Sequence, residues 1–175
     1  MEIELRAKIT NEKLLENNLK LLAGIAEKIG GERQVDIYLK HENDIERRMV
    51  VRIRKNYENN KAILTFKGKA KGADVAWADY DTPIENPDKL EAVLTGNGYV
   101  YVCLVDKIRQ SFTYNDFEIN IDNVRDLGLF IEIEKQGKED EVEVCKKEII
   151  GLLSKLGISE NNIINQGYVQ LMINK

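Results

Sequence analysis

The stretch Glu2-Ile3-Glu4-Leu5-Arg6-Ala7-Lys8 alternates charged and apolar residues. Successive side chains of a β-strand point to opposite faces, so this stretch predicts a strand with all of its charges on one face. The alternation returns in five later segments: Val51-Arg52-Ile53-Arg54, Asp79-Tyr80-Asp81, Lys107-Ile108-Arg109, Asn120-Ile121-Asp122 and Glu132-Ile133-Glu134. This recurrence indicates a sheet whose strands share one charged face, and that face carries both signs of charge.

Size and composition predict one globular domain over residues 1–175. The chain is 43% hydrophobic and 32% charged, with a net charge of −4, which argues against a general nucleic-acid coat and against a basic membrane-surface protein. No apolar run approaches the roughly 18 residues of a membrane-spanning helix. The first residues lack a basic region followed by an apolar stretch, so no secretory signal is expected. We therefore expect a cytoplasmic protein that binds neither nucleic acid nor membrane.

Cysteine and histidine offer little material for catalysis. Cys103 and Cys145 lie in a strand-like and a helix-like segment and are interpreted as reduced packing thiols. His41 is the single histidine and lies in a polar stretch, where we expect a solvated loop residue. Histidine-based zinc sites and Ser-His-Asp catalysis therefore lose their usual residues.

Periodicity predicts an α+β fold of about eight mostly antiparallel strands with helices on the outside. A first helix is expected from a cap at Thr10 to about Ile29, ended by Gly30-Gly31. Asn86-Pro87 should begin a second helix that ends at Gly96 or Gly98. The expected strands are 33–40, 48–55, 61–68, 75–82, 99–111, 112–122 and 128–136, with a turn at 115–116. A helix over 139–156, ended by residue 157, and a short helix over 167–173 complete the chain.

The charged face has two possible settings. Amphipathic helices can cover the apolar side of the strands, which leaves the charged side either in solvent, as in an open sheet, or inside a barrel. Charges inside a barrel need partners or a ligand, because their desolvation is costly. The face offers seven cations and seven anions: Arg6, Lys8, Arg52, Arg54, Lys67, Lys107 and Arg109, with Glu2, Glu4, Asp79, Asp81, Asp122, Glu132 and Glu134.

These residue types suit a metal ion and a polyphosphate. Arginine and lysine bind phosphate oxygens, and arginine adds planar bidentate geometry. Carboxylates hold Mg²⁺ or Mn²⁺, hard cations that bridge protein and phosphate. The sequence contains neither G-x-x-x-x-G-K-[ST] nor a G-x-G-x-x-G after a strand. Any phosphate site would therefore be built from side chains on strands.

The ordered motifs resemble those of the CYTH superfamily, the triphosphate tunnel metalloenzymes. Glu2-x-Glu4-x-Arg6 resembles the ExExK signature of that family. Further matches follow in family order: Gln34-x-Asp36-x-Tyr38, Val51-Arg52-Ile53-Arg54, Leu64-Thr65-Phe66-Lys67-Gly68, Lys107-x-Arg109, Ile121-Asp122-x-Val124, Leu127-Gly128-x-Phe130-Ile131-Glu132-Ile133-Glu134 and Gly167-Tyr168-Val169-Gln170-Leu171-Met172. The last of these is similar to the ending of class IV adenylyl cyclase-like members.

This resemblance implies a closed, mostly antiparallel eight-stranded β-barrel and a role for each matched residue. Glu4 and Glu132 would be the leading ligands of Mg²⁺ or Mn²⁺, supported by Glu2, Asp122 and Glu134. The triphosphate would lie against Arg6, Arg52, Arg54, Lys67, Lys107 and Arg109, with Lys8 as a secondary residue. The catalytic set would be Glu2, Glu4, Arg6, Lys107 and Arg109. The family also implies a homodimer.

The chain departs from the family pattern at three places. Arg6 replaces a lysine, which keeps the charge and changes the donor geometry. Trp77-Ala78-Asp79-Tyr80-Asp81 stands where the family has R-x-E-x-E, so one arginine is missing and both carboxylates are shorter by a methylene. Gln166-Gly167 replaces Arg-Ser. The change at residues 77–81 bears on how a substrate is oriented more than on triphosphate binding.

Three functions fit these residues. The first is an adenylyl cyclase of class IV type, which converts ATP to cyclic AMP and pyrophosphate. The second is a triphosphatase acting on inorganic triphosphate, thiamine triphosphate or a nucleotide. The third is a non-catalytic binder of triphosphate or polyphosphate. The sequence pattern leaves open which phosphorus is attacked.

Overall fold

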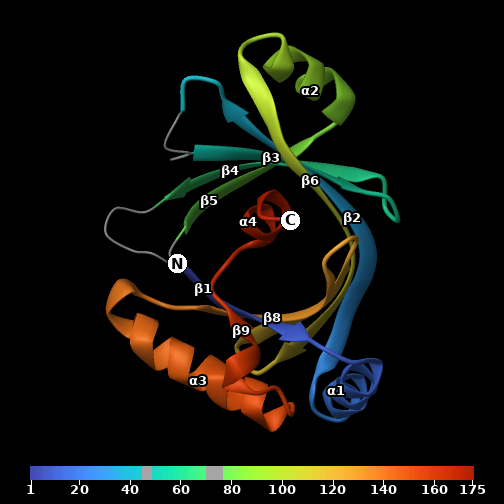
Figure 1. Ribbon diagram of the computed structural model, residues 1–175, viewed down its shortest axis with the longest axis vertical. Coiled ribbons are helices and arrows are strands. Elements are labelled where there is room, and N and C mark those ends of the chain that lie inside the picture. Colours follow the sequence, from blue (N-terminus) through green and yellow to red (C-terminus); the bar gives the residue numbers. More distant parts are fainter. Residues whose placement is uncertain (45–48, 70–76) are drawn as a thin grey trace. The chain divides into compact units, whose positions relative to one another are not determined.

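A computed structural model describes residues 1–44, 49–69 and 77–175 (Figure 1). Its strands are β1 (Glu2–Ile9), β2 (Glu27–His41), β3 (Met49–Asn56), β4 (Lys61–Lys69), β5 (Trp77–Ile84), β6 (Tyr99–Tyr114), β7 (Phe117–Val124), β8 (Gly128–Gln136) and β9 (Ile163–Ile164). Its helices are α1 (Glu12–Ile25), α2 (Pro87–Thr95), α3 (Val142–Lys155) and α4 (Tyr168–Ile173), with short 3₁₀ turns at Glu139–Glu141 and Glu160–Asn162. Residues 48 and 75–76, where two predicted strands begin, and the side chain of Asp79 lie outside the described part.

The strands form one sheet in the order β5-β4-β3-β2-β6-β7-β8-β1-β9. The ladders β1–β8, β1–β9, β2–β3, β3–β4, β4–β5 and β7–β8 are antiparallel. This confirms the predicted α+β class with a large antiparallel sheet. The described strands number nine rather than about eight, because the two-residue β9 pairs with Arg6 and Ala7 and is too short to give a periodic signal. Closure of the sheet into a barrel stays a prediction.

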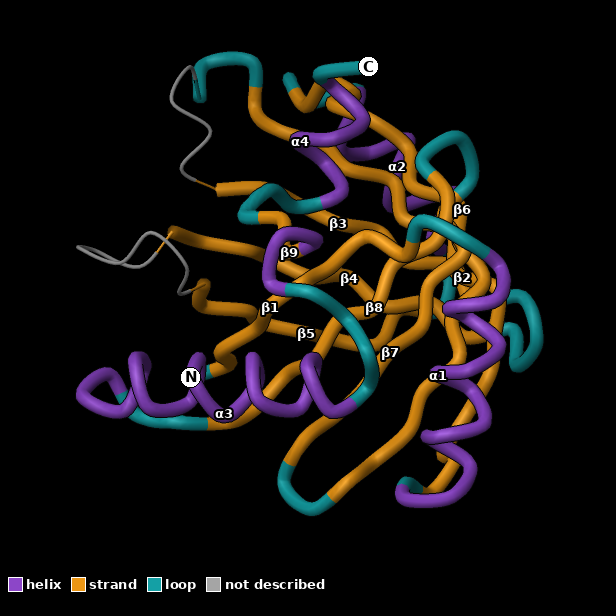
Figure 2. Tube along the Cα trace, turned by 60° about the horizontal axis from the view of Figure 1, so that its bottom comes forward, coloured by secondary structure: helices purple, strands orange, loops and turns teal. Residues whose placement is uncertain are grey.

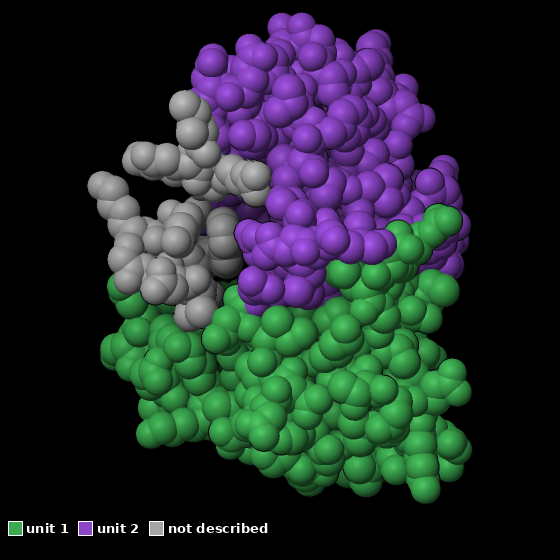
Figure 3. Space-filling view, in the orientation of Figure 1, with its two compact units in different colours: residues 1–31, 108–165 green, residues 32–107, 166–175 purple. Residues whose placement is uncertain are grey.

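The chain divides into two compact units, which Figure 3 shows in different colours. Unit 1 comprises residues 1–31 and 108–165, and unit 2 comprises residues 32–107 and 166–175. The expectation of a single domain over 1–175 stays a prediction. None of the described helices is both long and apolar enough to cross a lipid bilayer.

In unit 1, the odd-numbered residues of β1, β7 and β8 form the apolar side of the sheet. Ile3, Ile119 and Ile133 are buried there against Ile149 and Leu153 of α3. Helix α1 adds Leu22 to the same core, and Figure 2 shows both helices as separate rods beside the strands. The even-numbered residues of these strands therefore point to the opposite face, as the alternation predicts.

Unit 2 is built in the same way around α2. Ile37, Leu39, Val51 and Ile53 are buried, and Leu90 of α2 packs against them. These are odd positions of β2 and β3, so their even neighbours lie on the other face. In each unit, then, the helices cover the apolar side of the strands and leave the charged side to the site residues.

The first helix differs from its prediction at both ends. Its N-cap is Asn11 rather than Thr10, and the Asn11 side chain accepts a hydrogen bond of 2.6 Å from the Leu14 amide. It ends at Ile25 because Ala26 is already extended, with φ −126° and ψ 147°. Gly30 and Gly31 lie inside β2 and do not end the helix. Apolar residues up to Ile29 continue the helical spacing by coincidence, and Ile29 is 53% exposed.

Most other expected boundaries are confirmed. Helix α2 begins at Pro87 and is capped by Gly96, and Gly157 follows α3 with a φ of +78°. The hairpin turn has Asn115 at φ +55°, although β6 runs on to residue 114 instead of ending at 111. The prediction for His41 is wrong, because it ends β2 and its half-buried ring packs edge-on against Tyr99 at 5.3 Å.

Candidate functional site

The register of β1, β7 and β8 brings carboxylates of unit 1 together. Glu4 lies directly opposite Glu134 on β8, and Glu118 of β7 lies opposite Glu134 from the other side. Arg6 lies opposite Glu132. Like charges directly opposite one another destabilise a sheet unless something compensates them. The Glu4–Glu134 pair therefore marks a place where a cation would be stabilising.

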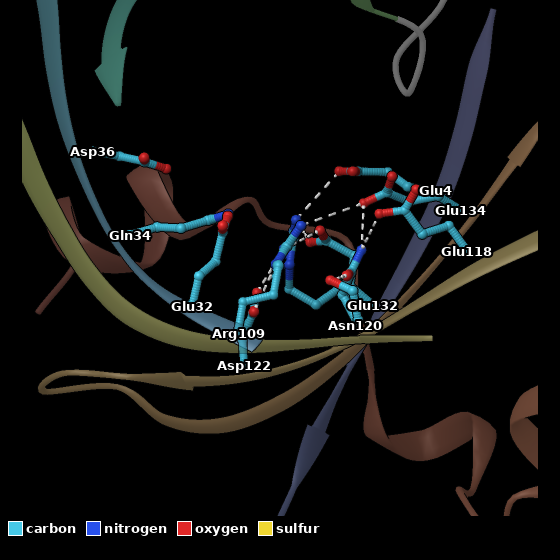
Figure 4. Close-up of polar contacts among 12 residues, drawn as sticks. Glu4, Glu32, Gln34, Asp36, Arg109, Glu118, Asn120, Asp122, Glu132 and Glu134 are labelled. Carbon is cyan, nitrogen blue, oxygen red and sulfur yellow. Dashed lines mark hydrogen bonds and ion pairs between the residues drawn. The ribbon is translucent and has the colours of Figure 1, made fainter. Parts of the chain in front are cut away.

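Glu4, Glu132 and Glu134 form the group that fits a metal ion. One carboxylate oxygen of each lies within 4.8 Å of the others, and Figure 4 shows the side chains converging. Three carboxylate oxygens are hard ligands, which Mg²⁺ and Mn²⁺ prefer. The donor set therefore fits the predicted metals, and it contains both leading ligands inferred from the sequence.

Glu132 is held by arginines of two strands. Arg109 Nη2 donates to its Oε1 at 2.7 Å, and Arg6 Nη2 donates to its Oε2. Arg6 also reaches Glu4 Oε1 at 3.3 Å. The Glu132 side chain is buried, so these contacts fix its orientation and compensate part of the negative charge.

Arg109 is anchored by a second carboxylate as well. Its Nε and Nη2 donate to the two oxygens of Asp122 at 2.8 and 2.7 Å, and Asp122 is fully buried. Burial alone would lower the pKa of Arg109, but the charges of Glu132 and Asp122 raise that pKa well above its usual value. Arg109 therefore stays ionised beside Asp122. The metal role of Asp122 and the triphosphate role of Arg109 stay predictions.

Glu134 is a carboxylate whose surroundings favour its protonated form when no metal is bound. Burial, followed by the charge of Glu132, raises its pKa to about 9. The buried Asn120 amide donates to Glu134 at 3.3 Å and to Glu118 at 3.1 Å, and it accepts from Ser111 at 2.6 Å. Glu118 was absent from the predicted set, although its even position on β7 places it on the charged face.

Glu2 and Lys8 occupy the two ends of the β1 face. Glu2 is half-buried and borders an open cavity of about 270 Å³ that Glu134 also lines. Lys8 is exposed, with its Nζ 5.9 Å from the centroid of the Phe130 ring. Glu2 therefore lies near the carboxylate group, whereas Lys8 lies four residues beyond Glu4 along the strand.

Unit 2 carries the other predicted cations. Arg54 forms two hydrogen bonds with Asp36, at 2.7 and 2.8 Å. Burial by itself would raise the pKa of Asp36, but the charge and hydrogen bonds of Arg54 lower it to about 2. Arg52 donates to Thr65 Oγ1 at 3.1 and 2.8 Å and lies 3.7 Å from Asp81. Both arginines extend from the same face of β3.

The two lysines of this unit differ in burial. Lys107 is buried, and its Nζ lies 5.2 Å from the centroid of the Tyr168 ring. A lysine over an aromatic face is stabilised by the ring quadrupole. Lys67 is half-buried on β4, in register between Val50 and Asp79. Each predicted cation of unit 2 therefore extends from the strand face that the alternation assigned to it.

Comparisons with known proteins agree with this geometry. The model of the CYTH domain family matches residues 1–168. A Methanocaldococcus jannaschii protein named "Putative adenylate cyclase MJ0240" is 30% identical, over 98% of this chain and 98% of the relative. The solved structure of the PH1819 protein from Pyrococcus horikoshii superposes with a TM-score of 0.84 at 26% identity, covering 99% of both chains.

A plant protein shares the fold at lower identity. The HpAC1 protein from Hippeastrum, named a "putative adenylyl cyclase" that "reveals a dominant" triphosphatase activity, superposes with a TM-score of 0.70 at 18% identity. The match covers 98% of this chain and 93% of the plant chain. The family model, the M. jannaschii relative and the converging carboxylates lead to one conclusion: this chain belongs to the CYTH domain family.

Proposed function

We propose that this chain is a metal-dependent enzyme that acts on a small-molecule triphosphate. The observation that carries the proposal is the convergence of Glu4, Glu132 and Glu134 in a chain of the CYTH family. Members of that family are adenylate cyclase-like or triphosphatase enzymes and are generally metal-dependent. Three carboxylates beside buried arginines suit a substrate that arrives as a complex of phosphate and a divalent cation.

In this proposal the residues divide between metal and phosphate. Glu4, Glu132 and Glu134 hold Mg²⁺ or Mn²⁺, with Glu2 and Asp122 in support. A bound ion would neutralise phosphate charge and polarise the phosphorus that is attacked. Arg6, Arg52, Arg54, Lys67, Lys107 and Arg109 bind phosphate oxygens, with Lys8 secondary. Closure of the sheet into a barrel lined by these side chains, a homodimer and a location in the cytoplasm are further parts of the proposal.

The first candidate reaction is that of an adenylyl cyclase. The ribose 3′-hydroxyl of ATP would attack the α-phosphorus, the bond to the bridging oxygen would break, and pyrophosphate would leave. Arginine and lysine side chains would stabilise the charge that develops on the departing pyrophosphate. The supporting observation is the adenylate cyclase name of the M. jannaschii relative, which matches at 30% identity over nearly the whole chain.

The second candidate reaction is hydrolysis of a triphosphate. Water would attack the terminal phosphorus, the bond to the bridging oxygen would break, and inorganic phosphate and a diphosphate would be released. The same cationic side chains would bind the substrate. The observation that favours it is the dominant triphosphatase activity of HpAC1, which has the same fold. Hydrolysis also demands less of the protein, because no ribose hydroxyl has to be aligned with phosphorus.

One assay distinguishes these reactions. The purified protein is incubated with Mg²⁺ or Mn²⁺ and ATP, thiamine triphosphate or inorganic triphosphate, and the products are resolved by chromatography. Cyclic AMP with pyrophosphate identifies the cyclase, and free phosphate without cyclic AMP identifies the triphosphatase. No turnover of any of the three would refute an enzymatic function, and retained binding in that case would identify a non-catalytic binder.

The Glu4→Gln variant tests the assigned site. It removes one charge from the metal group while keeping the shape of the side chain, so metal-dependent turnover should fall by at least about 100-fold. The matched control is Glu148→Gln, which removes a carboxylate of α3 that pairs with Lys135 outside the metal group. A fully active Glu4→Gln variant would remove Glu4 from the site.

A further inference from the structure

Gln34 of unit 2 has a buried acceptor that the phosphate-binding proposal does not use. The residue is 4% exposed and lies between Glu32 and Asp36 on the same face of β2 (Figure 4). Its Nε2 donates to Glu32 Oε1. In the part of the chain that the structure describes, its Oε1 accepts no hydrogen bond. Buried polar side-chain atoms are nearly always partnered, so this oxygen calls for an explanation.

The neighbours of Gln34 fix which end of its amide is left without a partner. An ionised carboxylate only accepts hydrogen bonds, so the amide nitrogen must face Glu32 and the oxygen must face the other way. Asn56 lies on β3, directly opposite Gln34, and its Nδ2 donates to the second oxygen of Glu32. Glu32 is therefore satisfied by two amides. The Gln34 oxygen remains, and in the described part of the chain it is removed from water without a compensating hydrogen bond.

The surroundings of this oxygen select the chemistry of a ligand. Phosphate oxygens are acceptors, and a second acceptor beside Gln34 Oε1 and the Glu32 carboxylate would be repelled. An N–H or O–H group would be bound. The arginines begin two residues further along the strand, where Asp36 pairs with Arg54, and continue where Tyr38 pairs with Arg52. Alternate residues of a strand lie roughly 7 Å apart, so one face offers an acceptor followed by two arginines.

We propose that Gln34 is a specificity residue that accepts a hydrogen bond from an amino or hydroxyl group on the organic part of the substrate. The site would then select a triphosphate that carries such a donor, as a nucleoside triphosphate does, over inorganic triphosphate. This inference rests on the proposed function and deepens it, because it names the substrate class. A site built to bond a polar group of its substrate discriminates against ligands that lack that group.

The test is equilibrium binding, so that it does not depend on turnover. Calorimetry with Mg²⁺ measures Kd in the wild-type protein and in Gln34→Met for the bis-methylene analogues of ATP and of inorganic triphosphate, whose bridging carbons neither candidate reaction can break. Methionine keeps the length and shape of the side chain and removes the acceptor. A net hydrogen bond of about 0.5–1.5 kcal/mol corresponds to a loss of about 2- to 13-fold. We expect that loss for the nucleotide analogue and less than about twofold for the analogue of inorganic triphosphate.

Asn56→Ala is the matched control, because it removes the other donor to Glu32 and leaves the Gln34 oxygen in place. It should bind both ligands as the wild-type protein does. Gln34→Asn is a second variant, in which the oxygen is withdrawn by one methylene, and it should show the same selective loss if Gln34→Met does not fold.

The possible failures are distinguishable. If the wild-type protein binds neither ligand, the proposed function fails. If it binds both and the Gln34 variants weaken both equally or neither, the proposed function stands and the role of Gln34 is refuted. A water molecule on the Gln34 oxygen, in place of the substrate, would give that second result.

Discussion

Two buried carboxylates, Asp122 and Asp36, are each held in a bidentate pair with an arginine. Arg109 with Asp122, and Arg54 with Asp36, each join two strands through two hydrogen bonds. A bidentate arginine–carboxylate pair has a fixed geometry, which orients both side chains. Removing one partner of such a pair leaves an uncompensated buried charge and is strongly destabilising. These pairs therefore give the charged face a rigid framework on which the remaining side chains are positioned.

The lowered pKa of Asp36 predicts a loss of stability in acid. Its pKa is about 2 in the folded protein and 3.8 in an unperturbed chain. The stabilisation is complete above pH 3.8 and is lost as the pH falls toward 2, because the unfolded state then binds the proton more readily. The difference of nearly two pKa units corresponds to about 2 kcal/mol.

Urea unfolding between pH 5 and pH 2 measures this effect in the wild-type protein and in Asp36→Asn. The variant should be less stable at pH 5, because Arg54 loses its partner. As the pH falls from 5 to 2, the free energy of unfolding should decrease by about 2 kcal/mol less in the variant than in the wild-type protein. Parallel curves for the two proteins would show that Asp36 does not titrate as the structure indicates.

Strand parity predicted the face of each site residue but not its partner. Glu4, Glu132 and Glu134 converge on one face, and their role as metal ligands stays a prediction. The sequence could not show that Asp122 pairs with Arg109, because alternation assigns a side chain to a face and leaves its neighbours across the sheet unspecified. The unpartnered oxygen of Gln34 depends on the rotamer that Glu32 selects, and no periodicity records a rotamer.

At the scale of elements, helices with a clear stop signal were predicted better than the helix that leads directly into a strand. Helices α2 and α3 end at or next to glycines, where the apolar pattern also stops. Helix α1 passes into β2 within two residues, and the apolar spacing continues across the junction. The local pattern was helical there, but strand pairing determines where the helix ends.

Helix α3 stabilises the strands that carry Glu4, Glu132 and Glu134. Ile149 is fully buried against the apolar side of β1 and β8, so Ile149→Ala should lower the free energy of unfolding by about 2–5 kcal/mol. Val144 lies on the same helix and is 59% exposed, so Val144→Ala should change it by less than about 0.5 kcal/mol. Urea denaturation measures both. Equal effects would show that α3 does not pack as described.

At the scale of the whole molecule, one principle recurs in both units. Helices cover the apolar side of antiparallel strands, and the opposite side concentrates buried ionisable groups. Concentrating charge in this way is costly unless the charges are paired or bind a ligand. Arginine–carboxylate pairs compensate part of that cost. A metal ion on Glu4, Glu132 and Glu134, with a triphosphate on the cations, would compensate the rest.

The affinity for Mn²⁺, measured by electron paramagnetic resonance, tests this account most directly. Glu134→Gln removes a carboxylate ligand and keeps the shape of the side chain, so the Kd for Mn²⁺ should rise at least about 10-fold. The pKa of Glu134 is raised to about 9, so the neutral glutamine resembles the protonated side chain of the metal-free protein. Glu148→Gln, which changes a carboxylate of α3 outside the group, should bind Mn²⁺ as the wild-type protein does. A Glu134→Gln protein that binds Mn²⁺ as tightly as the wild type would contradict the metal site.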